Sequence, residues 1–321
     1  MRKNRLQNHI SESSITLPLC MVIGALVWFW NGERLAFDYT LSGLIALVLA
    51  ILTTYVVMET ANAYALLRIR SGMIATVWVV GISLMTYTHA FSEAWIAALA
   101  MAGSHYVMFL AYQQYQPVVH VFHTFLLLGV ASLAVPQLLI LIPLYYWYMM
   151  VFLRALTWRG FWAGIVGMVL PGCFALGWSI LCDDFSFLLS RIEKLRGTDI
   201  LLGSDYDWML AYQDTETLIF GFISILSLIG IVHYLRNYYN DKIRTRMYLY
   251  IYVMQTVALW LMILCSPDLY HQLAPVLMLC ASTMIAHFFA LTRSIVSNLF
   301  FCLTLLAVTT LFTLNLGIWS F

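Results

Sequence analysis

Residues 41–58 read LSGLIALVLAILTTYVVM, an apolar run that contains no charged side chain. A run of about 18 such residues is a candidate for a helix that crosses a bilayer. Similar runs fill almost the whole chain, which is 63% hydrophobic and 10% charged, with a mean hydropathy of +0.87. A water-soluble protein keeps more polar residues on its surface than this composition provides. The sequence therefore predicts an integral membrane protein with many spans.

The apolar runs are continuous and do not alternate with polar residues, so they indicate helices. Their even spacing leaves no room for a separate water-soluble domain, and we expect residues 1–321 to form a single integral membrane domain. The predicted fold class is all-α, a polytopic transmembrane bundle of about eleven helices. The spans are expected near residues 15–30, 39–66, 72–88, 93–112, 117–134, 136–153, 161–181, 216–235, 247–265, 271–290 and 296–318.

The distribution of basic residues predicts how this bundle is oriented. Cytoplasmic loops are enriched in Lys and Arg, and this threading places most of the 16 basic residues on one side. We therefore expect a cytoplasmic N-terminus and a C-terminus on the opposite side. Joining the two runs that meet at Pro136 would lower the helix count by one and change the side of one end. The basic residues on the predicted cytoplasmic side are Arg2, Lys3, Arg5, Arg68, Arg70, Arg154, Arg159, Arg236, Lys242, Arg244, Arg246 and Arg293.

The longest connection, residues 182–215, has the pattern of a short amphipathic helix. Apolar residues recur every three or four positions from Phe185 to Leu195, and Asp183 or Asp184 can cap the helix start. We expect this helix to lie on the outer surface of the membrane, within an extracytoplasmic loop.

Five polar residues in the predicted spans form a candidate intramembrane site. Glu59 is the most deeply placed acid, and Asn62 lies one turn further along the same helix face. His105 lies in the next span but one, while His120 and His123 share a face at the start of the following span. Because lipid offers no partner to such groups, we expect Glu59 to point into the protein, within reach of at least one of these histidines. The cluster would be a proton or cation site, or a set of structural hydrogen bonds between helices.

A second candidate site lies on the outer face, where Asp183, Asp184, Asp205, Asp207 and Trp208 combine carboxylates with an aromatic ring. Such groups can bind a sugar or a cation, or act in acid–base chemistry. They can also form an ordinary solvated loop with a Trp anchored at the interface.

The sequence contains no recognised motif for a metal, a cofactor or a catalytic nucleophile. None of the 6 cysteines forms a CxxC pair, and no phosphate-binding or dinucleotide-binding fingerprint is present. We expect no cofactor and no metal. Cys182 and Cys265 are the two cysteines placed at the outer boundary, and whether they form a disulfide is left open by the sequence.

One segment resembles a known family. The run Ala131–Pro136 is followed by Tyr146-Trp147, by the basic turn Arg154–Arg159, and by Gly167 and Pro171-Gly172 in the next helix. This order is similar to that of a family of uncharacterised polytopic inner-membrane proteins of Bacteroidota, which carry a domain of unknown function. The resemblance implies the inner membrane of a Gram-negative bacterium and a periplasmic outer side, and it carries over no activity. Arg154 and Arg159 are candidate contacts for lipid phosphate, or simply the basic residues of a cytoplasmic loop.

Three classes of function remain open at this stage. The preferred one is transport or handling of a small solute or of a lipid-linked envelope substrate. The alternatives are a membrane enzyme that acts on lipid-linked sugars and a non-catalytic scaffold subunit of an envelope complex, so whether the protein is an enzyme is undecided. The expected partners are the lipid bilayer and a lipid-linked substrate or envelope protein. No basic run suggests nucleic acid.

Overall fold

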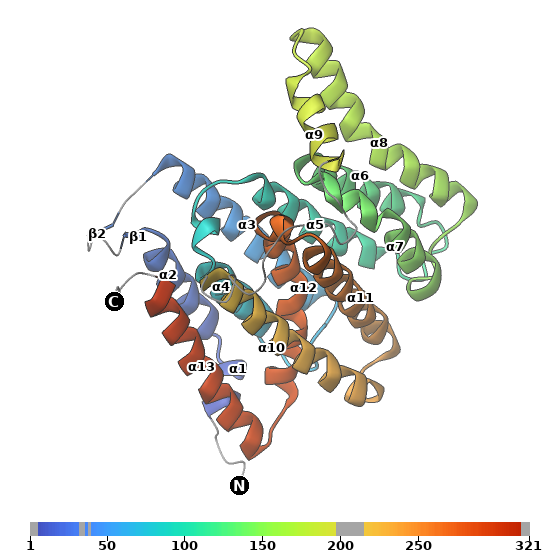
Figure 1. Ribbon diagram of the computed structural model, residues 1–321. Helices are drawn as coiled ribbons and strands as arrows, with labels where there is room; N and C mark the ends of the chain where they lie inside the picture. The colour runs from blue at the N-terminus through green and yellow to red at the C-terminus, as the bar shows by residue number, and fades with distance from the viewer. Residues whose placement is uncertain (1–5, 32–35, 38–39, 197–214, 316–321) are drawn as a thin grey trace. The chain divides into compact units, whose positions relative to one another are not determined.

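A computed structural model describes residues 6–31, 36–37, 40–196 and 215–315, and these residues are almost entirely helical (Figure 1). The predicted all-α class is therefore confirmed. The strands among the described residues are a two-residue antiparallel pair, β1 (Trp30–Asn31) and β2 (Ala36–Phe37). The helices group into two compact units, each built from separate stretches of the chain. Whether both belong to one membrane domain, as expected, stays a prediction.

The first unit comprises residues 1–92, 206–242 and 278–321. Buried polar contacts join its helices: the Trp78 indole N–H donates to Thr54 Oγ1 at 3.1 Å. The Gln7 side-chain amide donates to the Phe289 carbonyl at 2.6 Å and accepts from Ser297 Oγ at 3.1 Å. Its described helices are α1 (Leu6–Glu12), α2 (Thr16–Trp28), α3 (Leu41–Ala63), α4 (Met73–Leu84), the 3₁₀ turn Thr86–His89, α10 (Thr215–Asn237), the 3₁₀ turn Tyr238–Asn240, the second part of α12 (Tyr270–Leu291) and α13 (Ile295–Asn315).

The second unit comprises residues 93–205 and 243–277. Its tightest packing joins the two helices α6 and α8, where a Cβ added at Gly167 would lie 2.4 Å from the Phe122 carbonyl oxygen. A Cβ added at Gly129 would lie 2.6 Å from the Met168 carbonyl oxygen, so each helix presents a glycine to the other's backbone. The described elements of this unit are α5 (Glu93–Leu110), α6 (Val118–Ala134), a 3₁₀ turn (Pro136–Leu141), α7 (Ile142–Trp147), a π-helical turn (Tyr148–Phe152), α8 (Trp158–Leu181), α9 (Ser186–Arg196), α11 (Ile243–Cys265), a 3₁₀ turn (Pro267–Leu269) and the first part of α12.

The number of spans is smaller than expected. A helix occupies each of the eleven predicted stretches, but among the described residues only 7 helices are long and apolar enough to cross a membrane. The count rises to 8 if α1 and α2, which are bent by 88° at a short break, form one span. The structure thus shows a helical protein with several candidate membrane spans and does not confirm eleven.

Helix length explains the difference. At about 1.5 Å per residue, the 12 residues of α4 reach well short of a bilayer core about 30 Å thick. The stretch 136–152 changes from 3₁₀ to α to π geometry, so it is not one regular helix. This stretch contains Pro136 and Pro143, and each proline removes one backbone N–H donor. The hydropathy pattern located these segments, but it did not show which of them would form a regular helix long enough to cross a bilayer.

The predicted amphipathic helix of the 182–215 loop is present as α9. The Asp184 carboxylate accepts a hydrogen bond from the Ser186 backbone N–H at 2.8 Å, as expected for a residue that stabilises a helix start. Arg191 is buried, although it is a charged residue of an amphipathic helix: it donates two hydrogen bonds to Glu93 of α5 and one, at 3.2 Å, to the Ala134 carbonyl. Lys194 also contacts Glu93, at 3.1 Å. Two basic residues therefore attach α9 to the rest of the second unit.

Candidate functional site

The first unit contains a buried acid that the sequence did not single out. Asp241 follows the 3₁₀ turn Tyr238–Asn240 and precedes α11, and its side chain is only 1% exposed. Arg68, in the segment after α3, donates from Nε to Asp241 Oδ1 at 2.5 Å. The same guanidinium reaches the Asn237 carbonyl from Nη2 at 3.4 Å. A charged pair thus links the connections that follow α3 and α10.

A histidine lies at the second oxygen of the same carboxylate. His287 of α12 is fully buried, and its Nε2 lies 3.4 Å from Asp241 Oδ2. This distance suits an ion pair, but the atoms do not have hydrogen-bond geometry. Neither ring nitrogen of His287, nor Asp241 Oδ2, has a hydrogen-bond partner among the described residues. Buried polar atoms are nearly always hydrogen-bonded, so three atoms without a hydrogen bond at one place indicate capacity for a proton or a small polar ligand.

Helix α10 supplies the remaining members of this site. The His233 ring lies 5.9 Å from the His287 ring, and the Tyr234 ring lies 5.4 Å from it, nearly perpendicular. His233 Nδ1 is also buried and has no hydrogen-bond partner in the described part of the chain. We call Arg68, His233, Asp241 and His287 the polar cluster.

The electrostatics of the polar cluster keep Asp241 ionised. Burial by itself would raise the pKa of this carboxyl group. The neighbouring His287 ring and the Arg68 guanidinium act in the opposite direction and prevail, so the pKa of Asp241 lies below its ordinary value. A permanent cation, an anion and two imidazoles therefore share one buried region, although no group of three His, Cys, Asp or Glu side chains in the described residues is placed to hold a metal.

The structure does not test the predicted cluster of Glu59 with the three histidines. Glu59 is half-buried and Asn62 exposed, and both lie on α3 in the first unit. His105, His120 and His123 lie on α5 and α6 in the second unit. No hydrogen bond or ion pair joins Glu59 to another described residue. Its approach to a histidine stays a prediction.

Within the second unit, the three histidines occupy different surroundings. His105 is buried, with Nε2 at 3.2 Å from the Tyr145 hydroxyl and its ring 5.2 Å from that of Tyr252. His120 is half-buried and His123 exposed, and His123 Nδ1 lies 2.8 Å from the carbonyl of the residue four positions earlier. His105 thus belongs to an aromatic core, and no hydrogen bond or ring contact among the described residues joins it to the other two.

The outer-face candidates are only partly described. Asp183 is exposed and has a positive φ of 50°, and Asp184 is exposed and caps α9. Asp205, Asp207 and Trp208 lie outside the described residues. The candidate lipid-phosphate residues Arg154 and Arg159 are both exposed, at the connection before α8 and within its first turn. Cys182 and Cys265 are free thiols, so the structure contains no disulfide between them.

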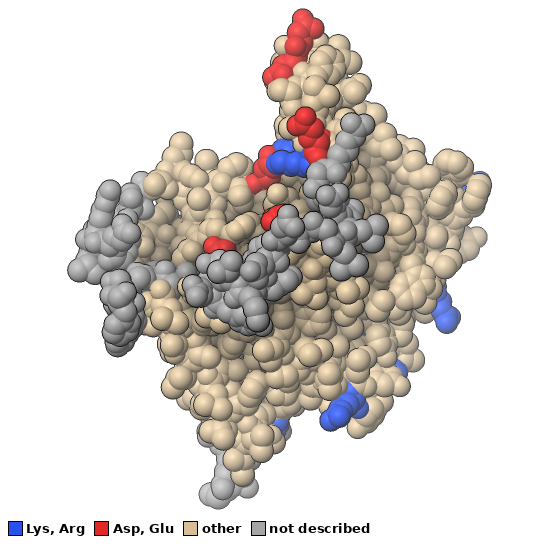
Figure 2. Space-filling model, viewed as in Figure 1, with Lys and Arg blue, Asp and Glu red and all other residues tan. Residues whose placement is uncertain are grey.

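The polar cluster was missed for reasons that differ from residue to residue. His287 stands in an apolar run much as His105 does, and that signal alone could have marked it. Asp241 stands beside Lys242 and close to Arg244, so it looked like part of a solvated loop. Most of the face shown in Figure 2 is uncharged, which agrees with charged residues being few in this chain.

Comparisons with protein-family models, with curated proteins and with solved structures gave no match. The resemblance to the inner-membrane family of Bacteroidota therefore stays an expectation.

Proposed function

We propose that the protein transports or handles a small solute at the membrane, and that the polar cluster is its ion-sensitive site. The observation that supports this most directly is the buried carboxylate of Asp241, which lies between Arg68 and His287 and whose Oδ2 is in no hydrogen bond among the described residues. Ionisable groups within apolar spans, such as His233 of α10 and His287 of α12, are rare, because they are costly to place there. They commonly mark solute or proton pathways.

The exposed fractions of the side chains in the polar cluster indicate from which end a solute would reach the site. The Arg68 side chain is 36% exposed, whereas those of Asp241 and His287 are almost completely buried. A solute or proton would therefore meet the site at Arg68 and proceed towards the imidazoles. The excess of Lys and Arg on one side of the predicted threading supports a cytoplasmic entrance.

The roles follow from the chemistry of each side chain. Arg68 is always charged and holds the carboxylate in place. Each imidazole offers ring nitrogens that can donate or accept a hydrogen bond. A polar group bound at these nitrogens would lie beside Asp241, whose Oδ2 is in no hydrogen bond among the described residues. The site can therefore take up a proton or a polar solute without first breaking the contact with Arg68.

Reconstituted vesicles provide the test. The purified protein would be placed in liposomes with a pH gradient, and accumulation of a panel of small labelled solutes would be measured. We expect at least one solute to accumulate with wild-type protein, and Asp241→Asn to reduce that accumulation about tenfold or more, since a lost charge-assisted contact is worth about 1.5–3 kcal/mol.

The matched control is Glu12→Gln. Glu12 belongs to the same unit and pairs with Arg293 at 3.2 Å, but both side chains are about half exposed. This variant should accumulate the solute as the wild type does. Wild-type accumulation by Asp241→Asn would contradict the role of the polar cluster, and no accumulation of any solute would contradict transport.

A further inference from the structure

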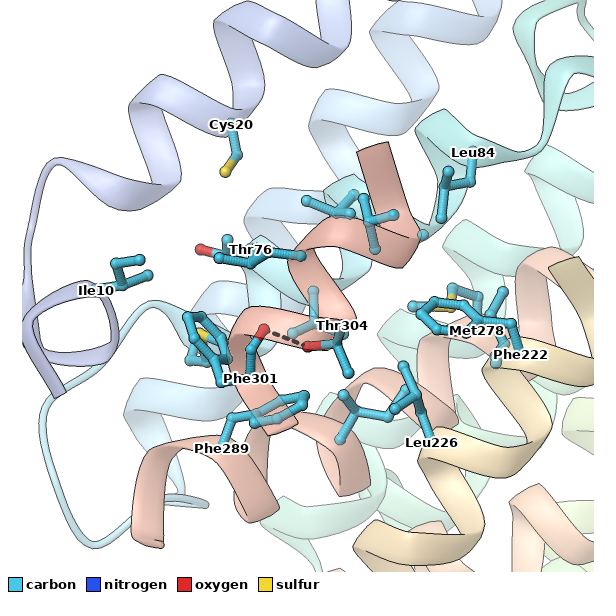
Figure 3. A pocket seen from close by; sticks show the side chains of 18 of the residues that line it. Ile10, Cys20, Thr76, Leu84, Phe222, Leu226, Met278, Phe289, Phe301 and Thr304 are labelled. Atoms are coloured by element: carbon cyan, nitrogen blue, oxygen red, sulfur yellow. Dashed lines mark hydrogen bonds between the residues drawn. The ribbon is translucent and has the colours of Figure 1, made fainter. Parts of the chain in front are cut away.

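The first unit contains a second feature, a pocket of about 130 Å³. Figure 3 shows side chains that line it. Met278, Ile285 and Phe289 of α12 line this pocket. Because residues two positions apart in a helix point about 200° apart, His287 faces away from Ile285 and Phe289. The pocket is therefore distinct from the proposed solute site, and an inference about it does not depend on that proposal.

The walls of the pocket are apolar, and their few hydroxyl groups already have acceptors. Thr76 donates to the Gly72 carbonyl at 3.0 Å, and Thr304 donates to the Phe301 carbonyl at 2.7 Å. Thr16 donates to the Ile10 carbonyl at 2.8 Å. An apolar cavity of about 150 Å³ stays free of water and binds small hydrocarbons. A pocket of this size and lining would therefore take hydrocarbon and exclude water.

The position of the pocket indicates where its occupant comes from. On α13, the pocket-lining residues Phe301, Thr304, Leu305 and Val308 follow helical spacing and form one stripe. Leu305 is 39% exposed, so this stripe continues into the outer surface of the helix. That outer surface carries Leu299, Leu303 and Leu306, which are among the most exposed apolar side chains of this candidate span.

The α13 wall of the pocket thus adjoins a surface that, in a membrane-spanning helix, faces lipid. Its remaining walls come from α1, α2, α4 and α10, and Figure 3 shows Cys20 of α2, Thr76 of α4 and Thr304 of α13 around the same space. We infer that this pocket binds one hydrocarbon chain of a membrane lipid, which enters beside α13. The chain belongs either to a phospholipid or to a polyisoprenyl lipid, since both present the same apolar chemistry to these walls.

Photo-crosslinking tests this inference directly. The wild-type protein would be placed in nanodiscs that contain a phospholipid with a diazirine in the middle of one acyl chain, irradiated and mapped by mass spectrometry. We expect adducts on pocket residues such as Cys20, Thr76 and Thr304, in addition to adducts on the outward residues of α13. Adducts confined to outward residues such as Leu303 and Leu306 would overturn the inference, because they would show surrounding lipid only.

Two substitutions sharpen the result. Val80→Phe adds a ring to the pocket wall and should reduce the pocket adducts about fivefold or more while leaving the outward adducts within about twofold. Leu303→Phe, on the outward face, should leave the pocket adducts unchanged. Unchanged pocket adducts in folded Val80→Phe would overturn the inference. If Val80→Phe does not fold, the wild-type adduct map decides.

Competition identifies the source of the chain. Added polyisoprenyl phosphate that lowers the pocket adducts more than an equal amount of unlabelled phospholipid would assign the pocket to an isoprenoid chain. Equal competition by both lipids would assign it to acyl chains of the bilayer. Both results support a hydrocarbon site, whereas failure of both lipids to compete would contradict it.

Discussion

The Asp241 carboxylate holds Arg68 through one oxygen and leaves the other free beside His287. The pKa of Asp241 is depressed in the folded protein, and this determines the pH range in which the carboxylate stabilises the fold. In an unfolded chain an Asp titrates near pH 3.9, and a group with a lower pKa in the folded state stabilises the protein above that pH. This stabilisation is lost as the pH falls through the folded-state pKa.

The first prediction concerns that carboxylate. Asp241→Asn should lower the free energy of unfolding by about 1–2 kcal/mol at pH 7, a modest value because Arg68 is partly screened by solvent. The loss should shrink as the pH falls below about 3.9 and through the folded-state pKa, where wild-type Asp241 also becomes neutral. Thermal unfolding in detergent at several pH values measures it. Asp268→Asn, at an exposed position, is the control and should have no effect. Equal stability of Asp241→Asn and wild type at pH 7 would contradict the ion pair.

A second prediction concerns His89, which stacks on Trp28 at 4.6 Å with Nε2 at 3.2 Å from the Ser83 carbonyl. Burial lowers the pKa of His89 from 6.5 to about 4. The unfolded chain therefore takes up a proton as the pH falls below about 6.5, whereas the folded chain does not until about pH 4. The stability from neutral His89 is complete above pH 6.5 and declines below it.

Between pH 7.5 and pH 5 this decline should be on the order of 1–2 kcal/mol. His89→Phe keeps a ring on Trp28 but cannot titrate, so its unfolding temperature should depend less on pH over this range. His9→Phe, at an exposed histidine of the same unit, should keep the wild-type dependence. A wild-type slope in His89→Phe would show that His89 is not the group responsible.

Individual residues also show where reasoning from the sequence stops. The pattern marked Glu59 and His105 because each interrupts an apolar run, and the structure buries His105 against aromatic rings. It could not mark the pairing of Arg68 with Asp241, which are 173 positions apart. Neither residue has a local feature that distinguishes it from the basic and acidic residues of ordinary loops.

At the scale of helices, the contact between α6 and α8 depends on glycines whose neighbours are backbone atoms. Gly167→Ala places a methyl group within 2.4 Å of the Phe122 carbonyl oxygen, so the helices must separate. We expect a loss of about 2 kcal/mol or more, from the range for overpacked sites. Gly172→Ala is the matched control: it lies on the same helix, and a Cβ there meets nothing within 4 Å.

Gly172→Ala should be neutral or slightly stabilising, because Ala favours a helix over Gly by about 0.5–1 kcal/mol. The comparison of the two unfolding temperatures is the measurement. If both alanines had the same effect, the close approach of α6 and α8 would be wrong.

Helix α9 provides another prediction. Because Arg191 reaches Glu93 and the Ala134 carbonyl, Glu93→Gln should weaken the attachment of α9 to the second unit. Amide hydrogens of residues 186–195 should then exchange several-fold faster, as measured by mass spectrometry, since a charge-assisted bond is worth about 1.5–3 kcal/mol. Glu193→Gln, at an exposed position of α9, should leave the rates unchanged. Unchanged exchange in Glu93→Gln would contradict the attachment.

Helices were easier to predict than spans. Continuous apolar runs located all eleven helical stretches and the amphipathic α9, because hydrophobic patterning is a property of each segment by itself. The short α4 and the irregular stretch 136–152 have the same continuous apolar pattern. Neither forms a regular helix as long as Leu41–Ala63. Where a helix ends depends on contacts with other segments, which a hydropathy profile does not contain.

At the scale of the whole molecule, the number of crossings decides the side on which the C-terminus lies. Eleven crossings, or seven, place the two ends of the chain on opposite sides, and eight place them on the same side. From the Lys and Arg distribution we predict a cytoplasmic N-terminus with the 182–215 loop and the C-terminus on the periplasmic side. Reporter fusions after Ser204 and after Phe321 should both be active in the periplasm.

A cytoplasmic signal at Phe321 alone would mean an odd number of crossings after residue 204, where four candidate spans lie. Cytoplasmic signals at both sites would contradict the predicted side of the 182–215 loop. They would follow from a reversed chain, or from the bent pair α1 and α2, which precedes both fusion points, acting as an additional span.

The first unit's interleaved segments have a consequence for biosynthesis. A ribosome that adds about 5–20 residues per second places Arg68 in the nascent protein about 9–35 s before Asp241, which lies 173 positions later. The delay between the synthesis of Gln7 and that of its partner Phe289 is longer still, because 282 positions separate them. Until then, α1 and the guanidinium need substitute partners such as water, lipid headgroups or an insertion chaperone. Cells that express this protein faster than such partners are available should accumulate chains in which the first unit has not assembled.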